Sequence, residues 1–130
     1  MKLKLAPLRE VIKNKRVIVI DDSIVRGTTS RQIVKMLFEV GAKEVHFLVS
    51  SPPVKFPDFY GIDLSRQADL LASNKSIAEM NKYLGSTSLN FLSYKGMIKA
   101  TGLAESLFST SCFTGKYPIN IRERKKEVLY

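Results

Sequence analysis

Two short apolar runs with a stretch of helical periodicity between them dominate the first half of the sequence. Val17 to Ile20 is fully apolar and β-branched, which is typical of a strand buried on both faces of a parallel sheet. Apolar residues recur at helical spacing from Ile33 to Val40, and Gly41 follows where a helix commonly ends. Val45 to Val49 predicts a second strand. This order predicts a βαβ unit with parallel strands and a right-handed crossover.

The second half has shorter periodic segments. Prolines at residues 52, 53 and 57 predict an extended connection from Ser51 to Gly61. Ser76-Ile77-Ala78-Glu79 has the form of a capping box, which opens a helix, and Gly85 ends it. The other elements that we expect are a short helix from Arg66 to Ala72, a strand from Leu89 to Leu92, and a last helix from Tyr94 to about Ala100 capped by Ser93. The fold class is therefore α/β, with a partial parallel sheet, flanking helices and a helical C-terminal extension.

Composition and charge exclude some classes of protein but do not identify the function. The chain has 130 residues, of which 45% are apolar, so it can bury a core. No apolar run approaches the roughly 20 residues that span a bilayer, so we expect a cytoplasmic protein without membrane contact. The single cysteine, Cys112, agrees with a reducing compartment. The net charge of +9 suits a polyanionic partner, which is either nucleic acid or a phosphorylated small molecule.

The residues after the first strand carry the candidate chemistry. Asp21 and Asp22 end that strand, and the segment from Ser23 to Ser30 leads into the helix. Gly27 lets the backbone approach an anion, and the exposed amides of a helix N-terminus bind phosphate. Carboxylates beside a phosphate site repel the phosphate unless they bind hydroxyl groups or a cation. Ribose supplies hydroxyl groups, and Mg²⁺ is a suitable cation. The pattern therefore indicates a ribose 5-phosphate binder. The alternative is a plain turn whose aspartates cap the helix.

At these residues the chain resembles a known family. Val-Ile-Asp-Asp-Ser-Ile-Val-Arg-Gly-Thr-Thr-Ser is similar to the phosphoribosyl-pyrophosphate (PRPP) motif of type I phosphoribosyltransferases, and in this form to that of the glutamine PRPP amidotransferases. Further segments similar to the family follow in the same order, among them Ser50 to Pro53, Phe59 to Asp63 and Cys112 to Pro118. The resemblance covers almost the whole chain. It implies a partial type I phosphoribosyltransferase fold, with the PRPP loop in residues 1–64 and a helical extension in residues 65–130.

The resemblance implies a role for each residue of the loop. Asp21 and Asp22 would engage the ribose hydroxyls through Mg²⁺. The 5′-phosphate cradle would consist of Ser23, Ile24, Val25, Arg26, Gly27, Thr28 and Thr29. In the family, ammonia from glutamine displaces pyrophosphate from PRPP and gives phosphoribosylamine, the first step of purine nucleotide synthesis. We therefore expect a transferase that binds PRPP and purine nucleotides and that is a homo-oligomer in its full-length form.

Two departures from the family pattern shape these expectations. The family's N-terminal glutamine-hydrolysing cysteine has no counterpart, so we expect a C-terminal fragment without catalytic residues of its own, whose partner is the missing glutaminase and transferase half. One branch of the family holds an iron–sulfur cluster through cysteines. Here Asp58, Ser106 and Ser109 stand at those places, and clusters require thiolates, so no cluster is expected.

Two other hypotheses remain open. A non-catalytic regulator would sense PRPP and use its basic ends to bind nucleic acid, but residues 1–16 are too few for a winged-helix domain, so nucleic acid binding is not the leading expectation. An interaction module would pack against a separate glutaminase half. Half a sheet leaves an open strand edge, so in that case we expect the isolated chain to self-associate or to bind a complement.

Overall fold

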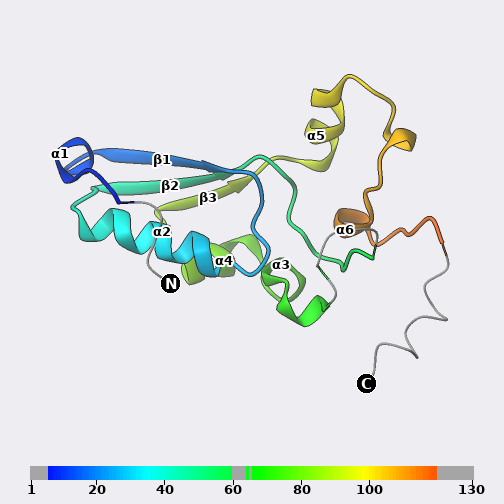
Figure 1. The fold of residues 1–130 in the computed structure, drawn as a ribbon, viewed down its shortest axis with the longest axis horizontal. Coiled ribbons are helices and arrows are strands. Elements are labelled where there is room, and N and C mark those ends of the chain that lie inside the picture. The colour runs from blue at the N-terminus through cyan, green and yellow to red at the C-terminus, as the bar shows by residue number, and fades with distance from the viewer. Residues whose placement is uncertain (1–5, 60–63, 65, 120–130) are drawn as a thin grey trace.

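Three parallel strands form the centre of the structure, a computed structural model that describes residues 6–59, 64 and 66–119. The strands are β1 (Arg16–Asp21), β2 (Glu44–Val49) and β3 (Ser88–Phe91), and they lie in the order β1-β2-β3 (Figure 1). α2 (Thr28–Glu39) connects β1 to β2, and Val19 pairs with Phe47 in the parallel register. The βαβ unit and the third strand predicted from the sequence are confirmed.

Two helices cover one face of this sheet. α2 and α4 (Ile77–Leu84) lie side by side beneath the strands (Figure 1). α4 begins with the predicted capping box: Glu79 N–H donates to Ser76 Oγ over 3.3 Å, and Ser76 N–H donates to the Glu79 carboxylate over 2.7 Å. α4 ends at Gly85 in the left-handed conformation. Local capping signals thus set the bounds of this helix, as expected.

Shorter elements lie around the sheet and the two helices that cover it. They are α1 (Arg9–Ile12), the 3-10 helix η1 (Gln67–Asp69), α3 (Leu71–Asn74), α5 (Tyr94–Thr101), the 3-10 helix η2 (Glu105–Leu107) and α6 (Ser111–Thr114). The helix expected from Arg66 to Ala72 is two short pieces instead, because Leu70 has an extended backbone between them. Ser93 caps α5 as predicted, by accepting a hydrogen bond from Gly96 N–H. None of the described helices has the length and apolarity needed to cross a membrane.

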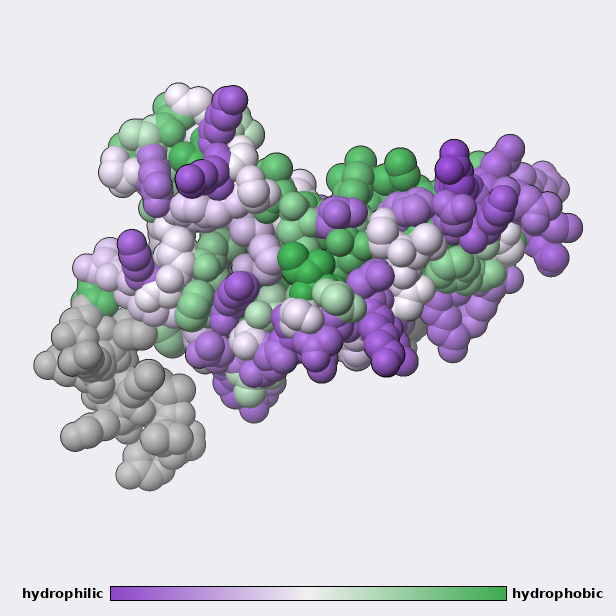
Figure 2. Space-filling model, turned by 180° about the vertical axis from the view of Figure 1, so that it is seen from behind, coloured by the Kyte–Doolittle hydropathy of each residue, from purple (hydrophilic) through white to green (hydrophobic). Residues whose placement is uncertain are grey.

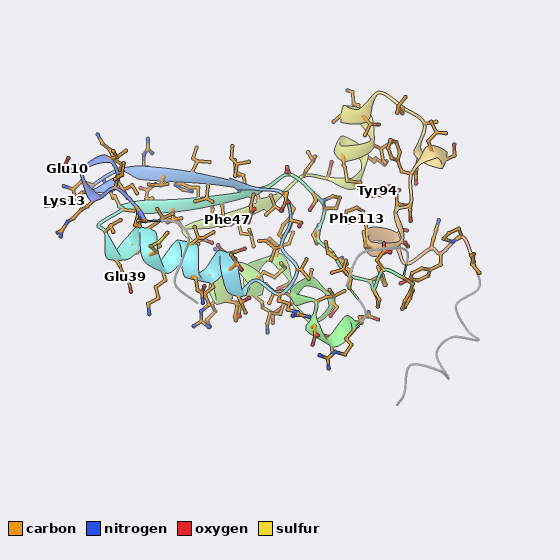
Figure 3. The ribbon with its side chains drawn as sticks, in the orientation of Figure 1. Glu10, Lys13, Glu39, Phe47, Tyr94 and Phe113 are labelled. Atoms are coloured by element: carbon orange, nitrogen blue, oxygen red, sulfur yellow. The ribbon has the colours of Figure 1, made fainter. Side chains whose placement is uncertain are left out.

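The main core lies between the sheet and its two helices. Phe47 is fully buried there and points from β2 toward α2 (Figure 3). Five of the core residues follow residue 64 in the chain, namely Leu71, Ala72, Met80, Leu84 and Leu89. A smaller cluster joins Val54, Leu64, Leu70 and Cys112. The division of the chain at residue 64 stays a prediction, and both sides of it contribute to the main core.

The expectation that β1 is buried on both faces is wrong. Ile18 is 62% exposed and Ile20 is 74% exposed, while Val17 and Val19 are partly buried toward the helices. Among the described residues, β1 pairs only with β2, and α2 and α4 cover only one side of the sheet. We call the uncovered side, which carries Ile18, Ile20 and Leu48, the open face. Figure 2 shows strongly hydrophobic residues along the upper edge of the molecule, over the sheet.

Candidate functional site

The loop between β1 and α2 lies at the carboxyl edge of the sheet, which is where ligands bind in open parallel sheets. Asp21 is the last residue of β1. Its carbonyl accepts hydrogen bonds from Ser50 N–H over 2.9 Å and from Ser50 Oγ over 3.1 Å. These bonds join the ends of β1 and β2. The loop therefore starts from a fixed position on the sheet.

The acid pair is held in place by local hydrogen bonds. Asp22 N–H donates to Asp21 Oδ1 over 3.0 Å, and Ser23 N–H donates to Asp22 Oδ1 over 2.6 Å. Ser23 Oγ also donates to Asp22 Oδ1, over 3.3 Å. In the described part of the chain, these bonds all use Oδ1, so the two Oδ2 atoms are available to a ligand. Asp22 is exposed and Asp21 is partly exposed.

The middle of the loop is anchored in the protein interior. Ile24 is only 1% exposed and belongs to the main core. The Val25 carbonyl accepts a hydrogen bond from Leu71 N–H over 2.8 Å, and the Val25 side chain packs on the smaller cluster. The Ile24 side chain is thus buried and the Val25 side chain partly buried, and both position the loop.

The end of the loop forms the start of α2. Gly27 occupies the N-cap position with φ 73°, and no side chain caps the helix, so the aspartates do not act as caps. The first-turn amides of an α-helix have no partner within the helix, and they carry its positive dipole end. Thr28 and Thr29 are exposed there, whereas Ser30 is buried. This end of the loop can therefore hold an anion through amides and hydroxyls.

Arg26 points toward a contact that the sequence did not predict. Its Nη2 atom lies 3.5 Å from Asp69 Oδ2, and Arg66 Nε lies 3.3 Å from the same oxygen. Asp69 is 43 residues further along the chain than Arg26. No local pattern in the sequence links them, so only the fold could show this pairing.

Two hollows in the described surface are lined by residues other than 21–29. A groove of about 550 Å³ runs between α2 and α4, beside Arg31 and Tyr83. The Arg31 guanidinium carbon lies 5.0 Å from the centre of the Tyr83 ring. A second hollow of about 390 Å³ lies at the end of β3, with Tyr94 and Phe113 in its wall (Figure 3).

The family resemblance assigns three described positions to cluster ligands, Asp58, Ser106 and Ser109, and Cys112 of α6 corresponds to none of them. Asp58 is 8% exposed and Cys112 is equally buried, while Ser106 is exposed on η2. Ser109 Oγ lies 3.3 Å from Ser111 Oγ. Burial raises the pKa of the Cys112 thiol, and the negative charge of Asp58 adds to this rise. Iron–sulfur clusters require thiolate ligands, and the absence of a cluster stays a prediction.

Comparison with known proteins gives one consistent result. The chain is 49% identical over 126 residues to an amidophosphoribosyltransferase of Synechococcus elongatus, and 48% identical over 125 residues to that of Bacillus subtilis. These matches cover 97% and 93% of this chain. The chain is a relative of the C-terminal part of the amidophosphoribosyltransferases. It spans about a quarter, 26%, of the length of these two relatives.

The solved structures agree with this assignment. Glutamine PRPP amidotransferase from B. subtilis, complexed with ADP and GMP, matches with a TM-score of 0.85 and 48% identity, covering 93% of this chain and 28% of that chain. A structure of the allosteric regulatory enzyme of purine biosynthesis matches equally well. No protein-family model matches the chain. The partial type I phosphoribosyltransferase fold expected from the sequence is confirmed by the amidotransferase neighbour.

Proposed function

We propose that this chain supplies the PRPP-binding loop of an amidophosphoribosyltransferase, which makes 5-phosphoribosylamine from PRPP and glutamine. The observation that carries the proposal is the loop at residues 21–29. It begins with an acid pair at the carboxyl edge of the sheet and ends with Gly27 at an uncapped helix N-terminus. The homology to amidophosphoribosyltransferases supports it. The alternative of a PRPP-sensing regulator or nucleic-acid-binding protein is not favoured by these relatives.

The two ends of the loop take different parts of PRPP. At the helix end, the first-turn amides with the Thr28 and Thr29 hydroxyls would hold the 5′-phosphate, and Arg26 would add a positive charge. At the strand end, Asp21 and Asp22 would hold the ribose hydroxyls. This assignment separates the carboxylates from the phosphate, and so limits the repulsion between like charges.

The acid pair also fits Mg²⁺. Magnesium is commonly bound through one or two carboxylates together with oxygens of the substrate, and Asp21 with Asp22 offers such a pair. No group of three or more His, Cys, Asp or Glu residues that could hold a metal occurs in residues 6–59, 64 and 66–119, so the ligand itself would complete the coordination. When bound, Mg²⁺ would neutralise charge on the leaving diphosphate. The chain's own part is to hold the ribose and the phosphate in place.

Other partners follow from the same loop. The ammonia would come from a glutaminase part, which the relatives would carry in the three quarters of their length that this chain does not match. Purine nucleotides also contain a ribose 5-phosphate, and one solved relative is complexed with ADP and GMP. We therefore propose that such nucleotides compete with PRPP for residues 21–29. A homo-oligomeric, cytoplasmic enzyme is the setting that we expect.

Calorimetric titration with PRPP, with and without Mg²⁺, tests the proposal. We expect saturable, Mg²⁺-dependent binding to the wild-type chain and its loss in an Asp21→Asn, Asp22→Asn double variant. A Glu10→Gln, Glu39→Gln double variant is the matched control, because it also removes two carboxylates, from the opposite end of the sheet (Figure 3). A folded wild-type chain that gives no binding heat, or equal binding by the two double variants, would contradict the proposal.

A further inference from the structure

The loop is held from outside by a segment that follows it in sequence by more than forty residues. Leu71 N–H donates to the Val25 carbonyl over 2.8 Å, and Leu71 Cδ2 packs beside Gly27. Two residues earlier, Asp69 Oδ2 contacts Arg26 Nη2 at 3.5 Å. The 3-10 helix η1 and the start of α3 thus pack against the loop. They contact it at three successive residues, Val25, Arg26 and Gly27.

We propose that Asp69 is a positioning residue, which orients the Arg26 guanidinium toward the phosphate of the bound ligand; this inference rests on the proposed function. Asp69 is suited to anchor Arg26 because its own backbone is fixed. The next two residues, Leu70 and Leu71, are 1% and 8% exposed. Asp69 N–H also donates to the Arg66 carbonyl over 3.1 Å. A carboxylate on so firmly held a backbone limits where the guanidinium can lie.

The geometry leaves Arg26 free to bind a second anion. The contact with Asp69 uses one nitrogen, Nη2, whereas a guanidinium has five N–H donors in a planar fork. The Arg26 side chain is 59% exposed, so its other donors are open to a ligand. An arginine held by a carboxylate on one edge presents its remaining donors in a narrower range of directions, and less side-chain entropy is lost when a phosphate binds.

A carboxylate beside an anion site would by itself oppose binding, and Arg66 offsets it. Arg66 Nε lies 3.3 Å from Asp69 Oδ2, on the same oxygen that contacts Arg26. Arg26, Arg66 and Asp69 form a trio of two guanidinium groups and one carboxylate, and this trio has a net positive charge. Asp69 can therefore orient Arg26 without making the surroundings of the loop repel phosphate. Because the trio is largely exposed, its effect on affinity is expected to be a few-fold.

The test is a double-mutant cycle on PRPP affinity in the presence of Mg²⁺. We expect Asp69→Asn to weaken binding about three- to fivefold, as suits a partly exposed ion pair. The same substitution in an Arg26→Gln background should have no further effect, since its target is gone. Asp69→Glu, which keeps the carboxylate, should recover part of the affinity. Glu39→Gln is the control, because Glu39 forms an exposed pair with Lys35 and lies away from the loop.

The cycle separates positioning from a merely structural role. If Asp69 only supported the fold of the loop, Asp69→Asn would weaken binding equally in both Arg26 backgrounds, and that result would overturn the inference. Unchanged or tighter binding by Asp69→Asn alone would overturn it too. A wild-type chain that binds no PRPP would reject the proposed function and the inference together, whereas binding that is insensitive to Asp69 rejects the inference alone.

Discussion

Gly27 and Leu71 lie so close together that a Cβ atom at residue 27 would be 2.7 Å from Leu71 Cδ2. Tyr83 Cε1 would be 3.2 Å from the same Cβ, on the side of α4. Gly27 also has φ 73°, a left-handed conformation that residues with side chains adopt at a cost. The turn into α2 therefore needs glycine for two separate reasons, its backbone conformation and its close packing.

Gly27→Ala should lower the free energy of unfolding by about 2–4 kcal/mol, the sum of a left-handed backbone penalty and overpacking. Gly102→Ala is the control. Gly102 has φ 69°, but a Cβ atom added there would have no neighbour within 4 Å, so only the backbone penalty of about 1 kcal/mol applies. Urea denaturation of both variants measures the difference. Equal losses would show that Leu71 and Tyr83 move aside freely.

Glu44 should make the stability of the chain depend on pH. The hydrogen bond from His46 Nε2, 2.9 Å long, is the main cause that lowers the Glu44 pKa below its ordinary 4.5, and Arg16 and Lys43 add to it while burial opposes it. A carboxyl with a lowered folded-state pKa stabilises the fold above its ordinary pKa, and this contribution is lost as the pH falls through the folded value. Wild type should therefore lose more stability than Glu44→Gln as the pH falls below 4.5.

Urea midpoints measured from pH 6 down to about pH 3, through the ordinary carboxyl range, test this expectation. His46→Leu keeps the Glu44 carboxylate but removes the largest cause of its shift. Its profile should therefore follow Glu44→Gln more closely than wild type. Parallel profiles of all three proteins would show that the Glu44–His46 contact does not contribute in solution.

Much of the fold was predictable because its signals are local. The capping box at Ser76, the cap at Ser93 and the apolar run at Val45 each act within a few residues, and each prediction is confirmed. The helix expected from Arg66 was wrong in detail, because contacts with the loop and the core set the backbone of Leu70 and Leu71. A periodic pattern cannot report such tertiary contacts.

In the candidate site, too, the sequence predicted the features that are local in the chain and missed those that depend on tertiary contacts. The acid pair and Gly27 are adjacent in sequence, so the motif itself indicated a loop with two chemically different ends. Asp69 belongs to the surroundings of Arg26 only through the fold. The apolar character of β1 indicated a strand but not its exposure, because burial depends on which elements lie against each face, and Ile18 and Ile20 have none against them among the described residues.

The thiol of Cys112 should react slowly in the folded chain. It is 8% exposed, and burial together with the charge of Asp58 raises its pKa, so little reactive thiolate exists at neutral pH. Reaction with a chromogenic disulfide at pH 7 should be slow before unfolding and fast in urea. The folded rate should rise as the pH is increased, since deprotonation limits it. Equal rates in the folded and unfolded chain would contradict both the burial of Cys112 and its raised pKa.

The open face should make the chain bind apolar compounds. Burying an aliphatic side chain gains about 1.5–3 kcal/mol, and Ile18 and Ile20 are left 62% and 74% exposed on adjacent positions of one face. An Ile18→Thr, Ile20→Thr variant keeps β-branched residues in the strand while it removes most of this apolar surface. We expect it to bind less of a fluorescent apolar-surface dye than wild type and to self-associate less in size-exclusion chromatography.

Ile77→Thr provides the matched control for the open face. Ile77 is 47% exposed, but it lies on α4, beneath the covered side of the sheet. If any exposed aliphatic residue bound the dye, Ile77→Thr would lower dye binding about half as much as the Ile18→Thr, Ile20→Thr variant, which replaces two residues. If the open face is responsible, dye fluorescence and the apparent size should stay close to wild type. A wild-type chain that elutes as a monomer and binds no dye would show that Ile18 and Ile20 are covered in solution, against what the described structure leaves exposed.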